Sequence, residues 1–281
     1  YEREIDVQSH PVLASHVIDG RAVVPLALMA EWFAHAALHE NPGLVLHGLE
    51  DMRVLNGIRL KEESKLIRLF AGKARRRNGV YEVDLELRNG VREGKDILHS
   101  RARAILADGY AAPPAYRLPE SLSCNHYPRS AAEIYEKILF HGQRLRGLRT
   151  VQCCNAAGMV AEVVRATEPS HWMAAPMRNS WLCDPLVLDS AFQMASVWCY
   201  EQHGCVSLPS RAESYRQFRT GFPDAGVVVA LEVTDATARR MRGDFTFMDG
   251  RGEVIARLTG YEAVMDPLLN RAFKPEAPPA G

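Results

Sequence analysis

The chain of 281 residues is long enough for two modest domains or one large one, and its 47% hydrophobic and 24% charged residues exclude disorder as its main state. Lysine and arginine together number 34, as do aspartate and glutamate, so the zero net charge gives no overall field that attracts nucleic acid or an anionic membrane. We therefore expect neither as a partner, and we interpret the basic run from Lys73 to Arg77, beside Asn78-Gly79, as a solvated hairpin turn.

The sequence shows no sign of export or of a membrane anchor. It has no stretch of about 18 apolar residues and no basic-then-apolar N-terminus, so we expect a cytoplasmic protein. Its proline-rich residues 270–281 and its first residue, Tyr1 rather than Met, are typical of a domain taken from a larger protein.

Six cysteines without Cys-x-x-Cys spacing argue against a disulfide framework or a zinc site, and we expect Cys153 and Cys154 to be buried or half-buried strand thiols.

The first 108 residues are predicted to form an N-terminal unit, 1–108. Residues 24–40 are rich in alanine, leucine and methionine and are apolar on nearly all sides, which predicts a helix wrapped by other structure. Alternating apolar and polar residues, with turns at Asn78-Gly79 and Asn89-Gly90, predict an antiparallel sheet after this helix. The strands of this sheet are expected over residues 66–70, 80–87 and 97–106.

A linker is predicted over residues 109–128, where prolines accumulate and the periodicity is lost. The second unit, 129–267, repeats the order of the first, with a helix over residues 185–201 against antiparallel strands. These strands are expected over residues 159–165, 227–233, 244–248 and 253–264. Residues 268–281 are assigned to an interdomain linker. A helix wrapped by a curved antiparallel sheet is a hotdog unit, so the pattern predicts an α+β fold of two tandem units, a double hotdog.

Two groups of residues suited to chemistry precede the two predicted helices. In the first group, His16 lies on the approach to the helix, Gly20 permits close backbone contact, and Pro25 suits a first helical position. Free backbone N–H groups at such a helix end attract a carbonyl oxygen or an anion. A histidine with an ordinary pKa of about 6.5 is mostly neutral at neutral pH, so His16 can accept a proton.

The second group begins with Asp184, which can cap the second helix, and Pro185, which suits its first position. Asp189 follows one turn later among apolar neighbours, and Gln193 shares its face and can hydrogen-bond its carboxyl group. Burial of an unpaired carboxyl group raises its pKa and favours a neutral acid that can donate a proton. We therefore predict that His16 and Asp189 form a base and acid pair. The alternative is that Asp189 only caps or pairs with an arginine and that His16 is a loop histidine.

Both groups resemble the signature motifs of the dehydratase domains of polyketide synthases and polyunsaturated-fatty-acid synthases. The matching residues are His16, Gly20 and Pro25 in the first motif, and Asp189 and Gln193 in the second. The preceding His10-Pro11 also resembles the opening of this family, and the resemblance runs from about residue 10 to residue 264. Members of the family are double hotdogs, so the resemblance and the pattern of elements predict the same fold.

The resemblance implies that His16 removes the α-proton of a β-hydroxyacyl thioester while Asp189 protonates the departing β-hydroxyl group. It also implies that the Gly20 N–H, near the helix that Pro25 begins, stabilises the thioester oxygen, and that Gln193 positions Asp189. The substrate would arrive on the phosphopantetheine of an acyl carrier protein, and no metal or redox cofactor is expected. The implied partners are this carrier protein and neighbouring domains of the same megasynthase, and the sequence leaves open whether two copies form a homodimer.

One segment departs from the family's pattern. The family has a segment rich in tyrosine and glycine that ends in Gly-Pro-x-Phe, whereas this chain has His141 and Gly142 followed by Gln143 and Leu145. This difference bears on the shape of the substrate tunnel more than on the chemistry. We interpret His141 as a turn or wall residue that can touch substrate. Tyr215 is a second candidate for substrate contact, with a plain structural role as the alternative.

Other functions are compatible with these features. A hotdog acyl-thioesterase carries a carboxylate on its helix, and a product-template-like cyclase or an isomerase keeps the same motifs with a different pocket. A non-catalytic domain that only binds carrier protein is expected to have lost the catalytic residues. The presence of both His16 and Asp189 favours a dehydratase over a thioesterase or a non-catalytic domain, whereas the sequence does not separate a dehydratase from such a cyclase or isomerase.

Overall fold

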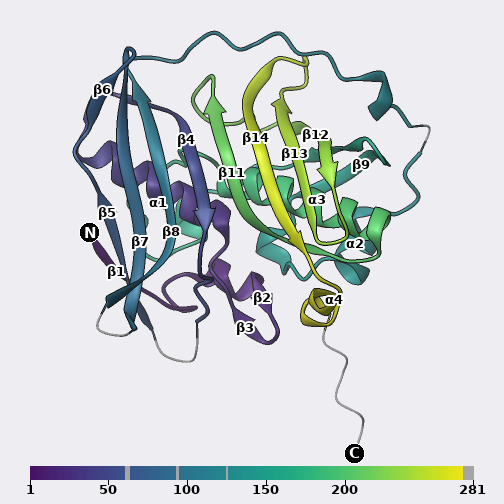
Figure 1. Ribbon diagram of the computed structural model, residues 1–281, viewed down its shortest axis with the longest axis horizontal. Helices are drawn as coiled ribbons and strands as arrows, with labels where there is room; N and C mark the ends of the chain where they lie inside the picture. Colours follow the sequence, from purple (N-terminus) through teal and green to yellow (C-terminus); the bar gives the residue numbers. More distant parts are fainter. Residues whose placement is uncertain (61–63, 93–94, 125, 275–281) are drawn as a thin grey trace, which may run out of the picture.

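The computed structural model describes residues 1–60, 64–92, 95–124 and 126–274. Its main feature is a 12-stranded antiparallel sheet, which lies in front of two long helices in Figure 1. The strands of this sheet are β1 (Glu2–Ile5), β4 (Val45–Val54), β5 (Lys65–Ala71), β6 (Arg75–Arg77), β7 (Val80–Arg92), β8 (Lys95–Ala107), β9 (Leu148–Asn155), β10 (Gly158–Val163), β11 (Ser207–Gln217), β12 (Val227–Ala236), β13 (Arg240–Met248) and β14 (Val254–Met265). Across the sheet the order is β1-β5-β7-β8-β4-β11-β14-β13-β12-β10-β9, with β6 paired to β7.

The two long helices are α1 (Leu26–His39) and α3 (Pro185–His203). Every residue of α1 except His39 is buried, as its apolar sequence predicts. At the start of α3 the Asp184 side chain accepts hydrogen bonds from N–H groups of the first turn, and Pro185 is the first helical residue, which confirms the predicted cap. On α1, Glu31 accepts hydrogen bonds from the N–H groups of Leu182 and Cys183, so its carboxylate ties α1 to the loop that leads into α3.

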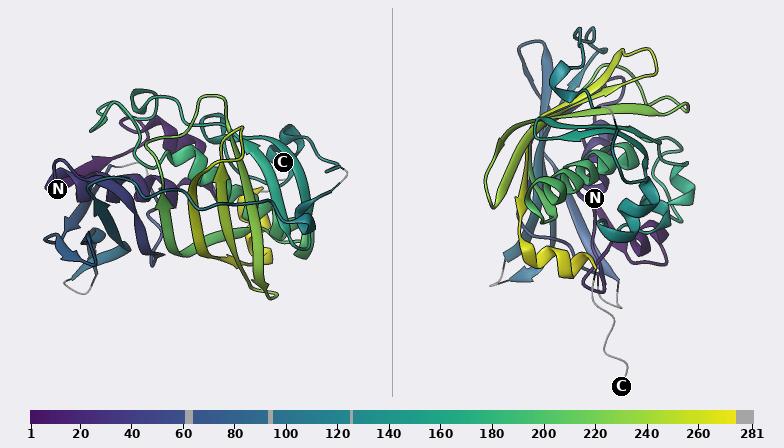
Figure 2. Two further views of the ribbon diagram at one scale, coloured as in Figure 1. Left: turned by 90° about the horizontal axis from the view of Figure 1, so that it is seen from above. Right: turned by 90° about the vertical axis from the view of Figure 1, so that its right-hand side faces the viewer.

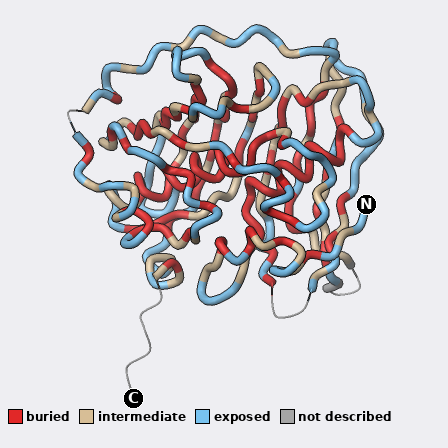
Figure 3. The backbone as a smooth tube through the Cα atoms, turned by 180° about the vertical axis from the view of Figure 1, so that it is seen from behind, coloured by how far each residue is buried: buried red, intermediate tan, exposed pale blue. Residues whose placement is uncertain are grey.

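Each half of the sheet wraps one helix. Strands β4, β5, β7 and β8 contact α1, whereas β9 to β13 contact α3, whose enclosure is visible on the right of Figure 2. The predicted α+β double hotdog is therefore confirmed. The two halves are joined where β4 pairs with β11, with Leu49 opposite Tyr215, so the chain forms one continuous sheet. Buried backbone is concentrated along the helices and the strands that face them (Figure 3). Within the described residues, no helix is long and apolar enough to cross a membrane.

Two predicted turns have different outcomes. Asn78 and Gly79 both have positive φ angles, 48° and 82°, and connect β6 to β7 as predicted. The turn predicted at Asn89-Gly90 is wrong, because β7 continues through these residues to Arg92. Gly90 has a φ of 59°, and the register of β7 against β8 shifts between Asn89 and Val91, so the glycine accommodates a bulge rather than a turn.

Several short elements were not predicted. Helix α2 (Ala131–Lys137) begins with a capping box between Ser130 and Glu133. Helix α4 (Pro267–Phe273) is capped by the Asp266 side chain, so the assignment of residues from 268 onward to a linker is wrong as far as the helix extends. A small hairpin of β2 (Val17–Ile18) and β3 (Arg21–Ala22) precedes α1. The short 3-10 helices are η1 (Pro11–Ser15), η2 (Glu120–Leu122), η3 (Gln143–Leu145) and η4 (Pro169–His171).

The segment between the two halves follows the surface along the top of Figure 1. Its described residues between 109 and 128 contain no strand or α-helix, and only η2 interrupts the extended chain. Tyr116 donates a hydrogen bond to Glu232 Oε1 over 2.9 Å, which attaches the segment to the second half of the sheet.

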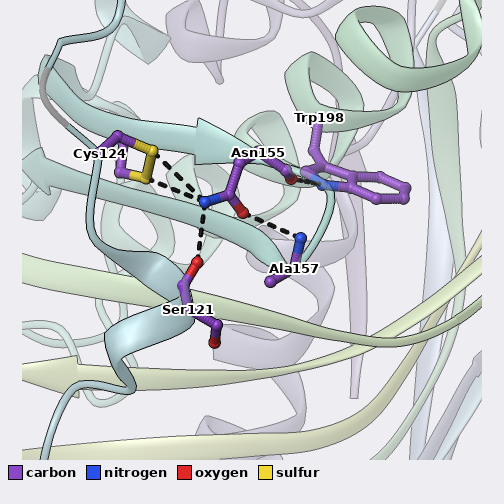
Figure 4. Close-up of a disulfide and its surroundings, with 6 residues drawn as sticks. Ser121, Cys124, Asn155, Ala157 and Trp198 are labelled. Carbon is purple, nitrogen blue, oxygen red and sulfur yellow. Dashed lines mark hydrogen bonds between the residues drawn. A yellow bond between two sulfur atoms is a disulfide. The ribbon is translucent and has the colours of Figure 1, made fainter.

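A disulfide joins Cys124 of this segment to Cys153 on β9 (Figure 4). The prediction that Cys153 is a thiol is wrong, because the pairing depends on a fold contact across 29 residues of sequence. Asn155 lies beside the disulfide and donates to Ser121 O over 2.8 Å, while its own carbonyl accepts from Trp198 Nε1 on α3 over 2.7 Å (Figure 4). Cys154 is a half-buried free thiol, as predicted.

Candidate active site

A cavity of about 320 Å³ lies beside the N-terminal halves of α1 and α3 and is lined by residues from both units. Five of the predicted site residues line it, namely His16, Pro25, His141, Asp189 and Gln193. One ring nitrogen from each of the two histidines and one carboxyl oxygen of Asp189 lie within 4.8 Å of one another. The fold thus brings together residues that are far apart in the sequence.

His16 follows η1 and leads into β2, with 7% of its surface exposed. Its Nδ1 lies 2.7 Å from the carbonyl oxygen of Val23. Because a carbonyl oxygen can only accept, Nδ1 carries the hydrogen and Nε2 keeps a free lone pair. Burial lowers the pKa of His16 to about 4, an effect that Asp189 opposes and His141 reinforces. His16 is therefore neutral at neutral pH and can accept a proton.

Asp189 lies near the start of α3 with 3% of its surface exposed. Gln193, one turn further along, donates from Nε2 to Asp189 Oδ2 over 2.7 Å, which confirms the predicted contact. The same amide nitrogen donates to Leu145 O over 2.8 Å, and Gln193 Oε1 accepts from the Tyr135 hydroxyl over 2.7 Å. Because three partners hold the Gln193 side chain, it fixes the orientation of the Asp189 carboxyl group.

The direction of the Asp189 pKa shift differs from the prediction. Burial raises its pKa, but the hydrogen bond and charge of His141, together with His16 and Gln193, outweigh burial and hold the pKa below its ordinary value. The predicted raised pKa is wrong because it assumed an unpaired carboxyl group.

His141 approaches Asp189 from the loop between α2 and η3. Its Nε2 lies 3.3 Å from Asp189 Oδ2, and both side chains are buried. The Phe140 ring stacks on the His141 ring with centroids 4.0 Å apart, and the His16 ring lies edge-on to it at 5.4 Å. His141 therefore contacts the acid directly, which the interpretation as a turn or wall residue did not include.

Two glycines allow the loop that carries His141 to reach the site. A Cβ atom at Gly142 would lie 2.9 Å from the Cα of Ser15, the residue before His16. A Cβ atom at Gly147 would lie 2.0 Å from the Ser190 hydroxyl oxygen on α3. Gly142 does not line the cavity, and its role is to bring the two segments into close contact. Of the two departures from the family pattern, Gln143 is exposed and Leu145 is buried, where its carbonyl oxygen binds Gln193.

Two other predicted site residues lie elsewhere. Gly20 is exposed at the tip of the β2–β3 hairpin with a φ of 69°, where it completes a turn with Asp19. It does not itself line the cavity, although its neighbours Asp19 and Arg21 do, and its role as oxyanion donor stays a prediction. Tyr215 is buried on β11, where its hydroxyl donates to Gln217 Oε1 over 3.2 Å, and it does not line the cavity. The prediction that Tyr215 contacts substrate is therefore wrong, and its alternative structural role fits the structure.

The two helix starts beside the cavity differ in their caps. The Asp184 side chain accepts hydrogen bonds from backbone N–H groups in the first turn of α3. Helix α1 instead begins after Pro25, whose side chain cannot accept a hydrogen bond. Pro25 is thus the N-cap of α1 rather than its first residue. Leu28 N–H donates to the Pro25 carbonyl oxygen over 3.1 Å, so the N–H groups free of a helical partner are those that precede Leu28. The start of α1, which lines the cavity through Pro25 and Leu26, is therefore the positive helix end available to the cavity.

The cavity is also lined by residues that the motifs did not indicate. Leu269, Ala272 and Phe273 of α4 line it, and the Phe273 ring lies edge-on to Phe140 with centroids 4.4 Å apart. The exposed side chains of Arg21 and Arg59 also line the cavity. Helix α4 had one local signal, since Asp266-Pro267 is a cap followed by a proline suited to a first helical position.

The group of His16, His141 and Asp189 also offers a set of ligands for a metal ion. Two imidazoles and a carboxylate are suitable ligands for a divalent transition metal such as zinc. The hydrogen bond from His16 Nδ1 to Val23 would orient its Nε2 for such a role. The expectation of a metal-free site remains a prediction.

Comparison with known proteins places these observations in a family. Residues 119–265, more than half of the chain, match the family described as polyketide synthase dehydratase N-terminal domain. The chain is 27% identical over 235 residues to one of the proteins that make up the polyunsaturated fatty acid synthase of Thraustochytrium sp. (strain ATCC 26185 / S-3). That match covers 83% of this chain but 8% of the much longer relative.

Solved structures share the fold. The dehydratase domain from the CurF module of curacin polyketide synthase is 16% identical with a TM-score of 0.76, covering 94% of this chain and 92% of that one. A trans-AT polyketide synthase dehydratase domain from Brevibacillus brevis is 20% identical with a TM-score of 0.75, covering 95% and 93%. Together with the family match, which spans the segment that carries Asp189 and Gln193, these comparisons establish that the chain belongs to the polyketide synthase dehydratase family.

Proposed function

We propose that this domain removes water from a β-hydroxyacyl thioester carried by an acyl carrier protein and gives an α,β-unsaturated thioester. The observation that carries the proposal is that His16 from one unit and Asp189 from the other meet in one buried cavity, with side-chain atoms within 4.8 Å. A base and an acid at this separation can act on adjacent carbon atoms of one substrate.

His16 is suited to the role of base. Its Nδ1–H is held by Val23, its Nε2 is free, and its lowered pKa keeps it neutral. Nε2 would take the α-proton while the β-carbon loses its hydroxyl group. Hydroxide is a poor leaving group, so a proton must reach the oxygen as the bond breaks, and Asp189 is placed to pass it on. General acid or base assistance of this kind typically contributes about 10²–10⁴-fold.

Negative charge grows on the thioester oxygen as the α-proton leaves. The start of α1 lines the cavity through Pro25 and Leu26 and has no side-chain cap. Its unpaired N–H groups and positive helix end are suited to receive this oxygen. We assign them the oxyanion role that the sequence suggested for Gly20.

The exposed end of the cavity is suited to a phosphopantetheine arm. Arg21 and Arg59 line this end and are exposed, so their guanidinium groups can bind the phosphate of the arm.

The reaction we propose needs no metal or redox cofactor, since both proton transfers can be made by side chains. Neighbouring domains of the same synthase would supply the carrier protein.

Relatives support the roles of the two residue types. Structures of the CurK dehydratase of curacin polyketide synthase include two inactive mutants, one with a histidine replaced by phenylalanine and the other with an aspartate replaced by asparagine. The same two residue types meet in the cavity of this chain.

Mass spectrometry of β-hydroxyacyl thioesters of increasing chain length, incubated with the domain, tests this proposal. The expected result is loss of one water with the thioester intact. Release of the free acid would instead indicate a thioesterase. Recovery of every substrate unchanged, both with short thioester mimics and on a carrier protein, would contradict the proposal and favour a non-catalytic binding domain.

A further inference from the structure

We infer that His16, His141 and Asp189 form a binding site for one divalent transition-metal ion such as zinc, and that an ion bound there inhibits the domain. The binding site stands on the geometry of these three side chains. Its inhibitory effect rests on the proposed dehydration, because the ion would take the atoms that the reaction uses.

The three side chains supply ligand atoms of a suitable type. Two imidazole nitrogens and a carboxylate oxygen suit zinc and cobalt, whereas calcium and magnesium prefer oxygen ligands alone. Catalytic zinc sites use three protein ligands of these kinds and leave a fourth position for water or substrate. Within the part of the chain that the structure describes, this is the only group of three histidine, cysteine, aspartate or glutamate side chains that could hold a metal ion.

The separations of the ligand atoms fit a tetrahedral ion. Zinc lies about 2.1 Å from nitrogen and oxygen ligands, which places neighbouring ligand atoms about 3.4 Å apart. His141 Nε2 and Asp189 Oδ2 are already 3.3 Å apart. The ligand atoms of all three residues lie within 4.8 Å of one another, so closing around an ion needs a movement of no more than about 1.4 Å.

Neighbouring groups hold two of the ligands in place. The Nδ1–H of His16 donates to the Val23 carbonyl oxygen over 2.7 Å, which leaves Nε2 for a metal ion. Gln193 donates from Nε2 to Asp189 Oδ2 over 2.7 Å. Hydrogen bonds of this kind orient the ligands in metal sites. Because the His16 and Asp189 side chains are also buried, binding an ion costs them little conformational freedom.

His141 can offer its Nε2 to an ion without losing another polar contact. The Phe140 ring stacks on the His141 ring with centroids 4.0 Å apart, which fixes the plane of the imidazole. Its Nδ1 is buried and has no hydrogen-bond partner in the described ranges. The hydrogen that Nε2 shares with Asp189 can therefore move to Nδ1 when an ion takes its place, and no bond to Nδ1 is broken.

The cavity gives an ion access to the three ligands. All three residues line the space of about 320 Å³, so a water molecule from the cavity can complete the coordination. The exposed residues Asp19 and Arg21 line the same cavity, which is therefore open to solvent through an entrance that carries charges of both signs.

An ion in this position would stop the proposed reaction. The lone pair on His16 Nε2 that would take the α-proton is the pair that binds the metal. The Asp189 carboxyl group would likewise be held by the ion and could not pass a proton to the β-hydroxyl group. The site therefore links the activity of the domain to the concentration of free zinc.

Direct binding of Zn²⁺ and Co²⁺ to the metal-free domain tests the site. Calorimetry gives the stoichiometry and Kd for Zn²⁺, and the visible spectrum of Co²⁺ reports its geometry, because four-coordinate Co²⁺ absorbs far more strongly than six-coordinate Co²⁺. We expect one ion per chain and the strong four-coordinate spectrum, without the near-ultraviolet band that a thiolate ligand gives. A weak six-coordinate spectrum or a thiolate band would overturn the inference.

Two variants, His141→Gln and Asp189→Asn, each remove one ligand. Each should weaken Zn²⁺ binding by at least about tenfold, since loss of even an outer partner of a ligand typically costs about 10–100-fold. The matched controls are His39→Gln, which changes a side chain that is 70% exposed at the far end of α1, and Cys154→Ser, which removes a half-buried thiol. Both controls should bind as wild type does.

Equal affinities of the ligand variants and the controls would overturn the inference. Circular dichroism verifies folding, and if one ligand variant is unfolded, the other decides. For wild type, the rate of dehydration of a 3-hydroxyacyl N-acetylcysteamine thioester should fall in proportion to the zinc occupancy found by calorimetry, and excess EDTA should restore it. Full activity at saturating zinc would overturn the inhibitory role.

Failure of the proposed function has a different signature. If the wild-type domain releases no water from any substrate in the presence of EDTA, the proposed dehydration fails, while the binding measurements still decide the metal site. If wild type is active in EDTA but binds no zinc through these three residues, the metal site fails and the proposed dehydration stands.

Discussion

The backbone N–H of Gly142 donates to the carbonyl oxygen of Ser15 over 2.8 Å. This bond joins the residue after His141 to the residue before His16, so it sets the distance between the two histidines. The cavity is therefore assembled by a direct contact between the two units, and its geometry depends on the absence of a side chain at position 142.

Gly142→Ala is expected to force these segments apart, because its Cβ would lie 2.9 Å from the Ser15 Cα. We expect a loss of about 1–3 kcal/mol in the free energy of unfolding, as for other overpacked sites, and a lower kcat with a KM near that of wild type. Urea denaturation and steady-state kinetics measure the two effects. Gly109→Ala is the matched control, since a Cβ there meets no atom within 4 Å. Equal behaviour of the two variants would show that the contact does not shape the site.

The lowered pKa of His16 predicts a dependence of stability on pH. In the unfolded chain a histidine has a pKa of about 6.5, whereas in the folded protein burial lowers that of His16 to about 4. Between these values the unfolded state binds a proton that the folded state does not, so folding stability falls as the pH falls. The free energy of unfolding of wild type should therefore decrease relative to that of His16→Phe across this window. Parallel curves for the two proteins would contradict the assignment.

Phe273 is expected to limit the length of the acyl chain, because it lines the cavity and packs against Phe140. Phe273→Ala should shift the optimum of kcat/KM toward longer or bulkier acyl chains. Its effect on stability should be smaller than the about 3–5 kcal/mol typical of this substitution in a packed core, since one side of the ring faces the cavity. Leu268→Ala is the control, because Leu268 is 69% exposed on the same helix. An unchanged chain-length profile would show that α4 does not shape the pocket.

Arg21 and Arg59 are expected to bind the phosphate of the carrier arm. Replacing both with alanine should raise KM for a pantetheine-phosphate thioester by about tenfold, which corresponds to about 1.4 kcal/mol. KM for the N-acetylcysteamine thioester, which lacks the phosphate, should stay the same. Arg77→Ala serves as the control, because Arg77 is exposed on β6 in the first unit. Equal losses with both substrates would mean that these arginines act on the shape of the cavity instead.

Local signals predicted much of the fold. The Asp184-Pro185 cap and the apolar sequence around residues 26–38 specify α3 and α1 through contacts within a few residues, so periodicity and capping rules are sufficient. The pairing of β4 with β11 and the disulfide between Cys124 and Cys153 join segments far apart in the chain, and no local pattern specifies such partners.

The same distinction applies to the site. The contact of Asp189 with Gln193 follows from helical spacing, and its prediction is confirmed. The contact of Asp189 with His141 was missed because it depends on a loop that Gly142 and Gly147 allow to pack closely, and this reversed the expected direction of the Asp189 pKa. Tyr215 was misplaced because its position in the sequence does not show whether the side chain faces the cavity or lies in the core.

The most direct test of the account compares wild type, His16→Ala and Asp189→Asn in one mass-spectrometric assay of a β-hydroxyacyl thioester. We predict that wild type removes one water from the thioester, while both folded variants lose at least about 10²-fold in rate. Dehydration at the wild-type rate by either variant would contradict the claim that His16 and Asp189 are the base and the acid of this site.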